Sequence, residues 1–292
     1  MLGKSDDYAK IANKGMNIYA FLTLIVSLTA SFLFNINPHL PMYLCIIICL
    51  IAFIMYFFMK DISQNNIVNL NENNKKMKIK FSKTVWAIFI IYAIFYGIIV
   101  NGQQNTKLLI QYNLADIYNI EKVSIYLGII IVFSRLSRLI GSVVFGKVYY
   151  KIKDKSLLIL SSILVASFIL TTIGFLVELS ALKFILMTIG FCIILAVRDP
   201  FKLYINDIVL KITKNEEKQK AISYIGFSRK FGMTIGSLLV SAVLLKWKMI
   251  YVIIGIGILS IIDFLIAIKL YSMLKVKNKD NNTSKIKEKV KI

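Results

Sequence analysis

The sequence predicts an all-α polytopic membrane protein with eight transmembrane helices, arranged as two helices followed by a six-helix bundle. Of its 292 residues, 58% are hydrophobic, more than the roughly 45–50% that is usual in soluble domains. Apolar runs of about 20 residues, long enough to cross ~30 Å of hydrocarbon, recur along the chain. The net charge of +21 comes from lysines between these runs, a pattern typical of membrane topology rather than of nucleic-acid binding.

The first two predicted spans cover about 16–37 and 40–59 and form an N-terminal segment, residues 1–60. The polar, lysine- and asparagine-rich stretch at 61–83 is the one long linker, and it predicts a domain boundary on the cytoplasmic side.

Six further spans make up the predicted C-terminal bundle, residues 84–272. Pro200 in the sequence RDPF predicts a kink or an end of the sixth span, because proline removes a backbone donor and disfavours helix before it. The lysine-rich end, 273–292, is expected to be a basic cytoplasmic tail that is disordered or lies on anionic lipid. The expected spans cover about 84–113, 122–148 and 156–177, a region starting near 182, and about 221–245 and 249–271.

The distribution of the 32 lysines predicts the topology. With the N-terminus inside, 26 lysines fall in inner segments and 5 in outer ones, and Lys230 lies within a span. Because positively charged loops stay on the cytoplasmic side, this bias predicts a multi-pass protein of the cell membrane with an even number of spans and both termini in the cytoplasm.

Residues typical of catalysis or metal binding are scarce. Cys45, Cys49 and Cys192 lie in spans without further ligands nearby, and His39, the single histidine, lies in a short loop. A metal site needs more ligands than these, and there is no catalytic triad, phosphate-binding loop or dinucleotide fingerprint. We therefore expect no enzyme activity, metal or cofactor.

Two spans, a basic linker and six spans resemble the major facilitator superfamily from its fifth helix onward. That family joins the second and third helices of each bundle by a loop of the form G-x-x-x-D-[RK]-x-G-x-[RK]. The matching loop here, GKVYYKIKDK, keeps Gly146, Lys151 and Lys155, but Tyr150 replaces the acid and Lys153 the second glycine. The resemblance implies a partial major-facilitator fold in which the first four helices are missing.

Charged residues within spans are expected to face the bundle interior and to find partners. Helical rise places Arg229 and Asp263 at similar depths, and likewise Arg138 and Asp199, so each pair is predicted to form a buried ion pair. Arg135 lies near the middle of the membrane without an acid at its level. It is therefore free for an anionic solute, for a backbone carbonyl or for an acid on a missing helix.

Polar amides interrupt the third span, and they are compatible with two courses of the chain. Either the helix continues and the amides line the central cavity, or the helix ends and they form an outer loop. In the resembled family the matching helix is the first of the second bundle, and it lines the central cavity. The residues are Asn101, Gln103, Gln104 and Asn105.

A short internal similarity links SRLSRLIGSVV in the fourth span with SRKFGMTIGSLL in the seventh. These spans would be the middle helices of two three-helix units of opposite direction, as in an inverted repeat. The small residues of Ser142-x-x-x-Gly146 and Gly232-x-x-x-Gly236 are interpreted as helix-packing faces.

These observations bear on three classes of function. The first is a secondary transporter of the facilitator type for a small polar or anionic solute, incomplete in this chain, with the lipid bilayer and a chain supplying the missing helices as partners. The second is a non-transporting membrane protein or inactive remnant that acts through a partner. The third, a membrane-embedded enzyme, is disfavoured by the single histidine and the scarcity of acids.

Overall fold

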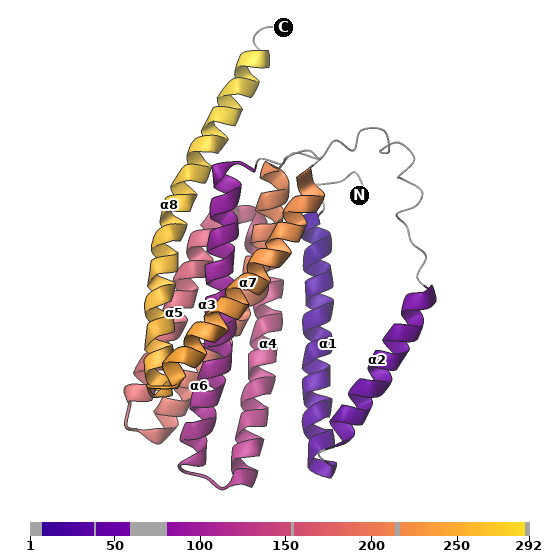
Figure 1. Cartoon of the computed structure of the whole chain (residues 1–292), viewed down its shortest axis with the longest axis vertical. Coiled ribbons are helices and arrows are strands. Elements are labelled where there is room, and N and C mark those ends of the chain that lie inside the picture. The colour runs from indigo at the N-terminus through magenta and orange to yellow at the C-terminus, as the bar shows by residue number, and fades with distance from the viewer. Residues whose placement is uncertain (1–7, 38, 59–80, 153–154, 214–216, 290–292) are drawn as a thin grey trace. The chain divides into compact units, whose positions relative to one another are not determined.

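The computed structural model of the chain describes residues 8–37, 39–58, 81–152, 155–213 and 217–289 (Figure 1). The described residues form eight α-helices and no strand, so the predicted all-α fold class is confirmed. The helices are α1 (Tyr8–Ile36), α2 (Leu40–Phe58), α3 (Lys83–Ala115), α4 (Ile120–Ile152), α5 (Ser156–Leu176), α6 (Ser180–Ile212), α7 (Lys218–Leu244) and α8 (Met249–Lys289).

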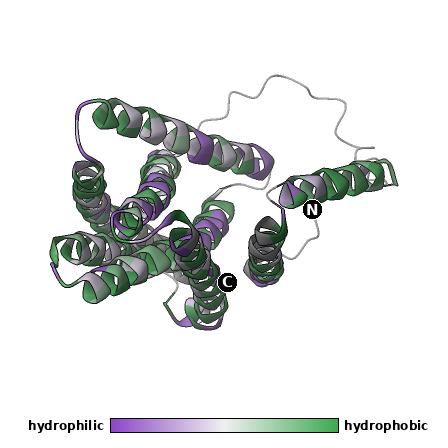
Figure 2. Cartoon of the chain, turned by 90° about the horizontal axis from the view of Figure 1, so that it is seen from below, coloured by the Kyte–Doolittle hydropathy of each residue, from purple (hydrophilic) through white to green (hydrophobic). Residues whose placement is uncertain are grey.

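Seven of the eight described helices are long and apolar enough to cross a membrane. Hydrophobic residues predominate along these helices (Figure 2). The exception is α7, which covers the seventh of the eight predicted spans. Its sequence includes Arg229 and Lys230 next to each other and several small polar residues, which lower its hydropathy. It nevertheless runs antiparallel to α6 and α8 along the bundle (Figure 1).

The chain divides into two compact units, and the division differs from the predicted one. One, here called the bundle unit, contains Met1–Leu24 and Phe81–Ile292, and the other contains Ile25–Lys80. The division thus lies within α1 rather than at the linker. Most of the predicted linker, 61–83, lies outside the described residues, and α3 begins at Lys83.

Of the two alternatives predicted at Pro200, a kink or a helix end, the helix end is wrong. Pro200 lies inside α6 without ending it. Its missing N–H frees the carbonyl of Ala196, and this carbonyl lies against Gly141 of α4, where a side chain would collide with it. Neighbouring helices often accommodate a proline in this way in membrane proteins. The predicted tail, 273–292, continues α8 as a helix to Lys289.

The core of the bundle unit forms around α3 and α6. Helix α3 packs against α6, α7 and α8, while α6 packs against α3, α4 and α5. The rings of Phe95 on α3 and Phe201 on α6 stack with centroids 3.3 Å apart. Part of α1 also packs against this core through Ala12 and Met16.

The packing of the six helices is internally symmetric. Exchanging α3 with α6, α4 with α7 and α5 with α8 maps the pair α3–α7 onto α6–α4 and the pair α3–α8 onto α6–α5. Because α3 and α6 run in opposite directions (Figure 1), the relation is that of an inverted repeat.

Equivalent residues make the two corresponding interfaces. In α4, Ser137 donates a hydrogen bond to the carbonyl of Cys192 at 2.8 Å, and Gly141 follows one turn later. In α7, Gly232 and Gly236 occupy the same positions against α3, where a Cβ on Gly97 would come within 2.7 Å of the Gly232 carbonyl. The similarity seen in the sequence therefore corresponds to a shared mode of packing.

Candidate functional site

All four arginines of the chain lie at the middle of their helices. Arg135 and Arg138 are within two residues of the midpoint of α4 (residue 136), Arg198 of α6 (196) and Arg229 of α7 (231). Two residues correspond to about 3 Å along a helix. We call these four residues the arginine cluster. Each cation at the centre of a bilayer costs about 2.5–3.5 kcal/mol by insertion scales, so the cluster requires compensation.

Arg138 has the partner that its depth predicted. Its Nε and one terminal nitrogen donate to the two carboxylate oxygens of Asp199 at 2.6 and 3.0 Å, and both residues are buried. The guanidinium also lies 5.0 Å from the centroid of the Tyr19 ring. A bidentate pair of this kind fixes both the position and the orientation of the guanidinium.

Arg198 and Arg229 share one aromatic ring. The guanidinium carbons of Arg198 and Arg229 lie 5.7 and 5.6 Å from the centroid of Tyr96. Arg198 also donates to the Tyr96 hydroxyl at 3.3 Å and to the side-chain oxygen of Gln103 at 3.1 Å. Because successive residues of a helix point in different directions, Arg198 faces α3 while the adjacent Asp199 faces α4. Neither Arg198 nor Arg229 forms an ion pair with a described residue.

Arg135 is half-buried, and its Nε is buried without a hydrogen-bond partner among the described residues. Arg138 and Arg198 are close enough to repel it electrostatically, while Asp199 attracts it. Since Arg138 already binds Asp199, Arg135 adds an uncompensated charge to the cluster.

A cavity of about 410 Å³ lies beside the cluster within the bundle unit. Four cationic side chains and one acidic side chain line it, and that acid is the one bound to Arg138. Two tyrosines on α1 and α3 complete the polar wall. The residues that matter here are Tyr19, Tyr96, Arg138, Arg198, Lys202 and Arg229.

The amides of α3 lie within a continuous helix, so the outer-loop alternative is wrong. They have different surroundings. Asn101 is buried between α3 and α7, where it accepts a hydrogen bond from Ser237 at 3.0 Å, and Asn105 donates to the carbonyl of Asn101 at 2.7 Å. Gln103 binds Arg198, whereas Gln104 is exposed. Of the amides, only Gln103 contacts the arginine cluster.

The predicted pair between Arg229 and Asp263 is wrong. Asp263 is fully buried and faces α5, where Ser161 donates to one carboxylate oxygen at 3.4 Å. The other oxygen has no partner among the described residues. Helix α8 packs mainly against α5 and α3, so equal depth on α7 and α8 did not bring these two side chains together.

The residues of the family loop motif lie at the ends of α4 and α5. Gly146 faces Asn13 of α1, while Lys151 and Lys155 are exposed. Lys153 lies outside the described residues. Near the motif, Tyr149 donates to the buried Asp207 of α6, and Lys211 forms an ion pair with the same carboxylate. Asp207 therefore supplies an acid at this end of α4, where Tyr150 replaces the one in the motif.

Sequence reasoning missed Arg198, Lys202, Tyr19 and Tyr96 as residues of the site. Arg198 was interpreted only as part of a kink. Counting residues from the ends of each helix would have placed Arg198 at the same depth as the other three arginines. For the tyrosines, depth alone does not indicate a role in the site. The described residues contain no group of three histidine, cysteine or acidic side chains that could hold a metal ion.

Comparisons with known proteins identify no relative: no family model matches the chain, and neither a curated protein nor a solved structure matches it significantly. A functional proposal for this protein therefore rests on its own residues and their geometry.

Proposed function

We propose that the chain is the larger part of a secondary transporter of the major-facilitator type, which moves a small anionic solute by alternating access. The observation that carries this proposal is the arginine cluster beside a cavity at mid-height of the bundle. Transporters of this type bind substrate near the bilayer midplane, between helices that line a polar cavity.

The charge of the site favours an anion. Of the cations that line the cavity, Arg198, Arg229 and Lys202 lack an ion pair with a described residue, and Arg135 adds a further unpaired charge to the cluster. Ionisable groups at this depth usually pair with one another or mark a solute pathway. A bound carboxylate or phosphate would offset part of this insertion cost, and guanidinium groups bind both in a bidentate geometry.

The residues of the cluster would have different tasks. Arg198, which contacts Tyr96 and Gln103, and Arg229, which lies over Tyr96, would bind the solute, while Asp199 keeps Arg138 in place. Arg135 would supply the free guanidinium. A cavity of about 410 Å³ is within the range of small-molecule sites.

The architecture supports alternating access. The six helices α3 to α8 pack as an inverted repeat, an arrangement found in each half of facilitator-type transporters. The lysine bias places the linker and both termini in the cytoplasm of the proposed topology. In this proposal, helices outside this sequence form the remaining wall of the cavity.

Flux in proteoliposomes tests the proposal. Vesicles would contain this chain alone, or this chain with a second chain that supplies the four additional helices of the first bundle. We expect saturable uptake of a small organic anion only with the second chain. Arg198→Gln should reduce the rate by at least tenfold, because a charge-assisted hydrogen bond contributes about 1.5–3 kcal/mol. Lys122→Gln, an exposed lysine at the start of α4, is the matched control. The absence of anion flux from both preparations would contradict the proposal.

An alternative is a non-transporting membrane protein whose arginine cluster pairs with an acidic side chain on a partner helix. The unpartnered Nε of Arg135 favours this reading, because such a helix would compensate the charge permanently. Cysteine crosslinking from position 135 to a co-purifying chain, together with an absence of flux, would favour it over transport.

A further inference from the structure

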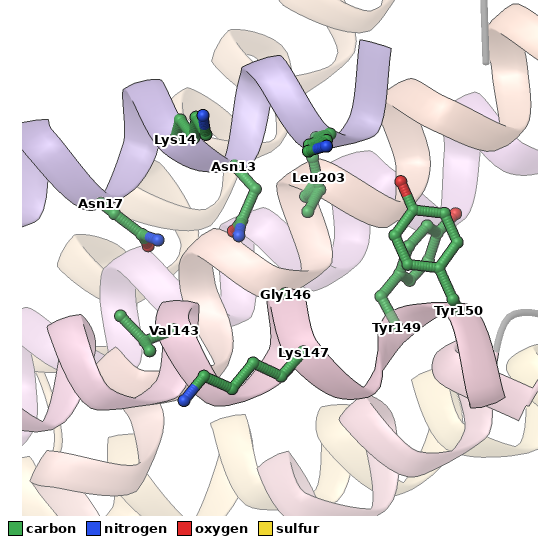
Figure 3. A pocket seen from close by; sticks show the side chains of 10 residues that line it. Asn13, Lys14, Asn17, Val143, Gly146, Lys147, Tyr149, Tyr150 and Leu203 are labelled. Atoms are coloured by element: carbon green, nitrogen blue, oxygen red, sulfur yellow. The ribbon is translucent and has the colours of Figure 1, made fainter. Parts of the chain in front are cut away.

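A second cavity lies between α1 and α4, away from the arginine cluster and near the end of the bundle that the lysines predict to be cytoplasmic. Its volume is about 240 Å³, and α1 and α4 provide most of its wall. Asn13 and Asn17 extend from α1 towards α4, where Lys147 lies along the opposite wall (Figure 3). No task in the proposed transport cycle has been assigned to this cavity.

Local geometry holds the two walls together. The hydroxyl of Ser142 donates to the side-chain oxygen of Asn17 at 2.7 Å. Gly146, one turn further along α4, has no side chain where the amide of Asn13 lies. The side-chain oxygen of Asn13 is buried without a hydrogen-bond partner among the described residues. Buried polar atoms in native structures usually have a partner, so the wall has a free hydrogen-bond acceptor.

The described residues that line this cavity carry positive charge alone. Lys10, Lys14 and Lys147 line it, and its lining includes no acid. None of the three forms an ion pair with a described residue. The acid on α6 below it, Asp207, is already bound by Tyr149 and Lys211, so it does not neutralise the three ammonium groups.

The depth of the cavity matches the position of lipid headgroups. Lys147 is 11 residues from the midpoint of α4 at residue 136, which is about 16 Å along the helix. Half the thickness of the hydrocarbon core is about 15 Å. Lys10 begins the apolar span of α1, Lys10–Thr29. The three lysines therefore lie where the apolar region ends.

We propose that this cavity binds the phosphate group of an anionic membrane lipid. Basic pockets between helices at the cytoplasmic interface are suited to such headgroups. Here the three lysines would bind the phosphate, and the free side-chain oxygen of Asn13 would accept a hydrogen bond from an ammonium group or from a hydroxyl of the headgroup. The acyl chains would extend along the apolar outer surface of α1 and α4, where Ile18 and Val144 are exposed. A lipid bound in this way would link α1 to the bundle.

Native mass spectrometry of the full chain, titrated in detergent with phosphatidylglycerol or phosphatidylcholine, tests the proposal. We expect one phosphatidylglycerol to bind at a much lower lipid concentration than phosphatidylcholine does. In the triple variant Lys10→Gln, Lys14→Gln and Lys147→Gln, the affinity should fall about a hundredfold, because a lysine near an anionic surface contributes about fivefold. The triple arginine variant should retain binding. Lys269→Gln, an exposed lysine on α8, should behave like the unsubstituted chain.

Equal phosphatidylglycerol binding by the unsubstituted chain and the triple glutamine variant would overturn the proposal. A soluble source of phosphate is tested separately with inorganic phosphate and glycerol phosphate in a neutral detergent. Tight binding of these anions, with the same dependence on the three lysines, would overturn the lipid assignment and identify the cavity as a site for a soluble phosphate. Thermal unfolding of each variant without lipid verifies folding. Because the three lysines are exposed and form no ion pair with a described residue, their substitution should leave the melting temperature unchanged.

Discussion

Asp199 is the residue on which the geometry of the arginine cluster depends. Its two oxygens bind Arg138 within the buried interface of α4 and α6, and no other described acid forms an ion pair with an arginine. Removing one member of a buried pair is costly, because the other charge stays buried without compensation. The neighbouring Arg198 depends on a different helix for its position, so the two arginines should respond differently to substitution.

Substituting Asp199 by Asn should destabilise the protein by about 3–5 kcal/mol. The double variant Arg138→Gln and Asp199→Asn should recover part of this loss, since it leaves no unpaired charge. Thermal unfolding in detergent measures both, with Glu178→Gln, an exposed acid in the α5–α6 loop, as the control. Equal melting temperatures for Asp199→Asn and the unsubstituted chain would contradict the buried pair.

Asp263 should be energetically independent of Arg229. Its carboxylate contacts Ser161 on α5, while Arg229 lies over Tyr96 of α3. A double-mutant cycle with Asp263→Asn and Arg229→Gln should therefore give a coupling energy below about 0.5 kcal/mol. A coupling of several kcal/mol would instead restore the ion pair that the sequence predicted.

At the scale of the helix, small residues determine how closely α3 and α7 approach. Gly97 and Gly232 place backbone against backbone, and Ser237 on α7 donates to Asn101 of α3. The related contact of α4 with α6 uses Ser137 and Gly141. These close approaches bring the helices that carry Arg138, Arg198 and Arg229 to a common centre.

Substituting Gly97 by Ala should destabilise the protein by about 1–3 kcal/mol, because the new methyl group would lie 2.7 Å from a backbone oxygen that cannot rotate away. Gly226→Ala on α7 is the matched control, since nothing lies within 4 Å of its Cβ position. The control should be neutral or stabilising by up to about 1 kcal/mol, from helix propensity. Equal melting temperatures for the two variants would show that α3 and α7 do not meet at these glycines.

At the scale of the whole molecule, α7 decides the topology. It is not among the seven described helices that qualify as spans on apolar character, yet both termini can share one side of the membrane only if α7 crosses too. Single cysteines would be placed at Lys246 and at Lys285 in a chain whose three native cysteines are replaced. We expect an impermeant thiol reagent to label position 246 from outside intact cells and position 285 only after lysis. Labelling of position 285 but not of position 246 before lysis would show that α7 does not cross.

Much of this architecture follows from the sequence because span length and the positive-inside bias are local properties. The Arg138–Asp199 pair was predictable from depth because the two side chains, which lie at the same depth, also face each other across α4 and α6. The Arg229–Asp263 pair was not, because depth alone does not specify which helix a side chain faces. The continuation of α6 through Pro200 depended on Gly141 of another helix, and the role of Tyr96 depended on two arginines distant from it in the sequence.

The central claim is that the arginine cluster binds an anionic solute, and calorimetric titration of the purified chain tests it most directly. The panel would contain small carboxylates and phosphate esters, each paired with its neutral amide or alcohol analogue. The account predicts saturable binding of one anion per chain, no binding of its neutral analogue, and a loss of at least tenfold in affinity in Arg198→Gln but not in Lys122→Gln. Equal affinity for an anion and its neutral analogue, or unchanged anion binding by Arg198→Gln, would contradict it.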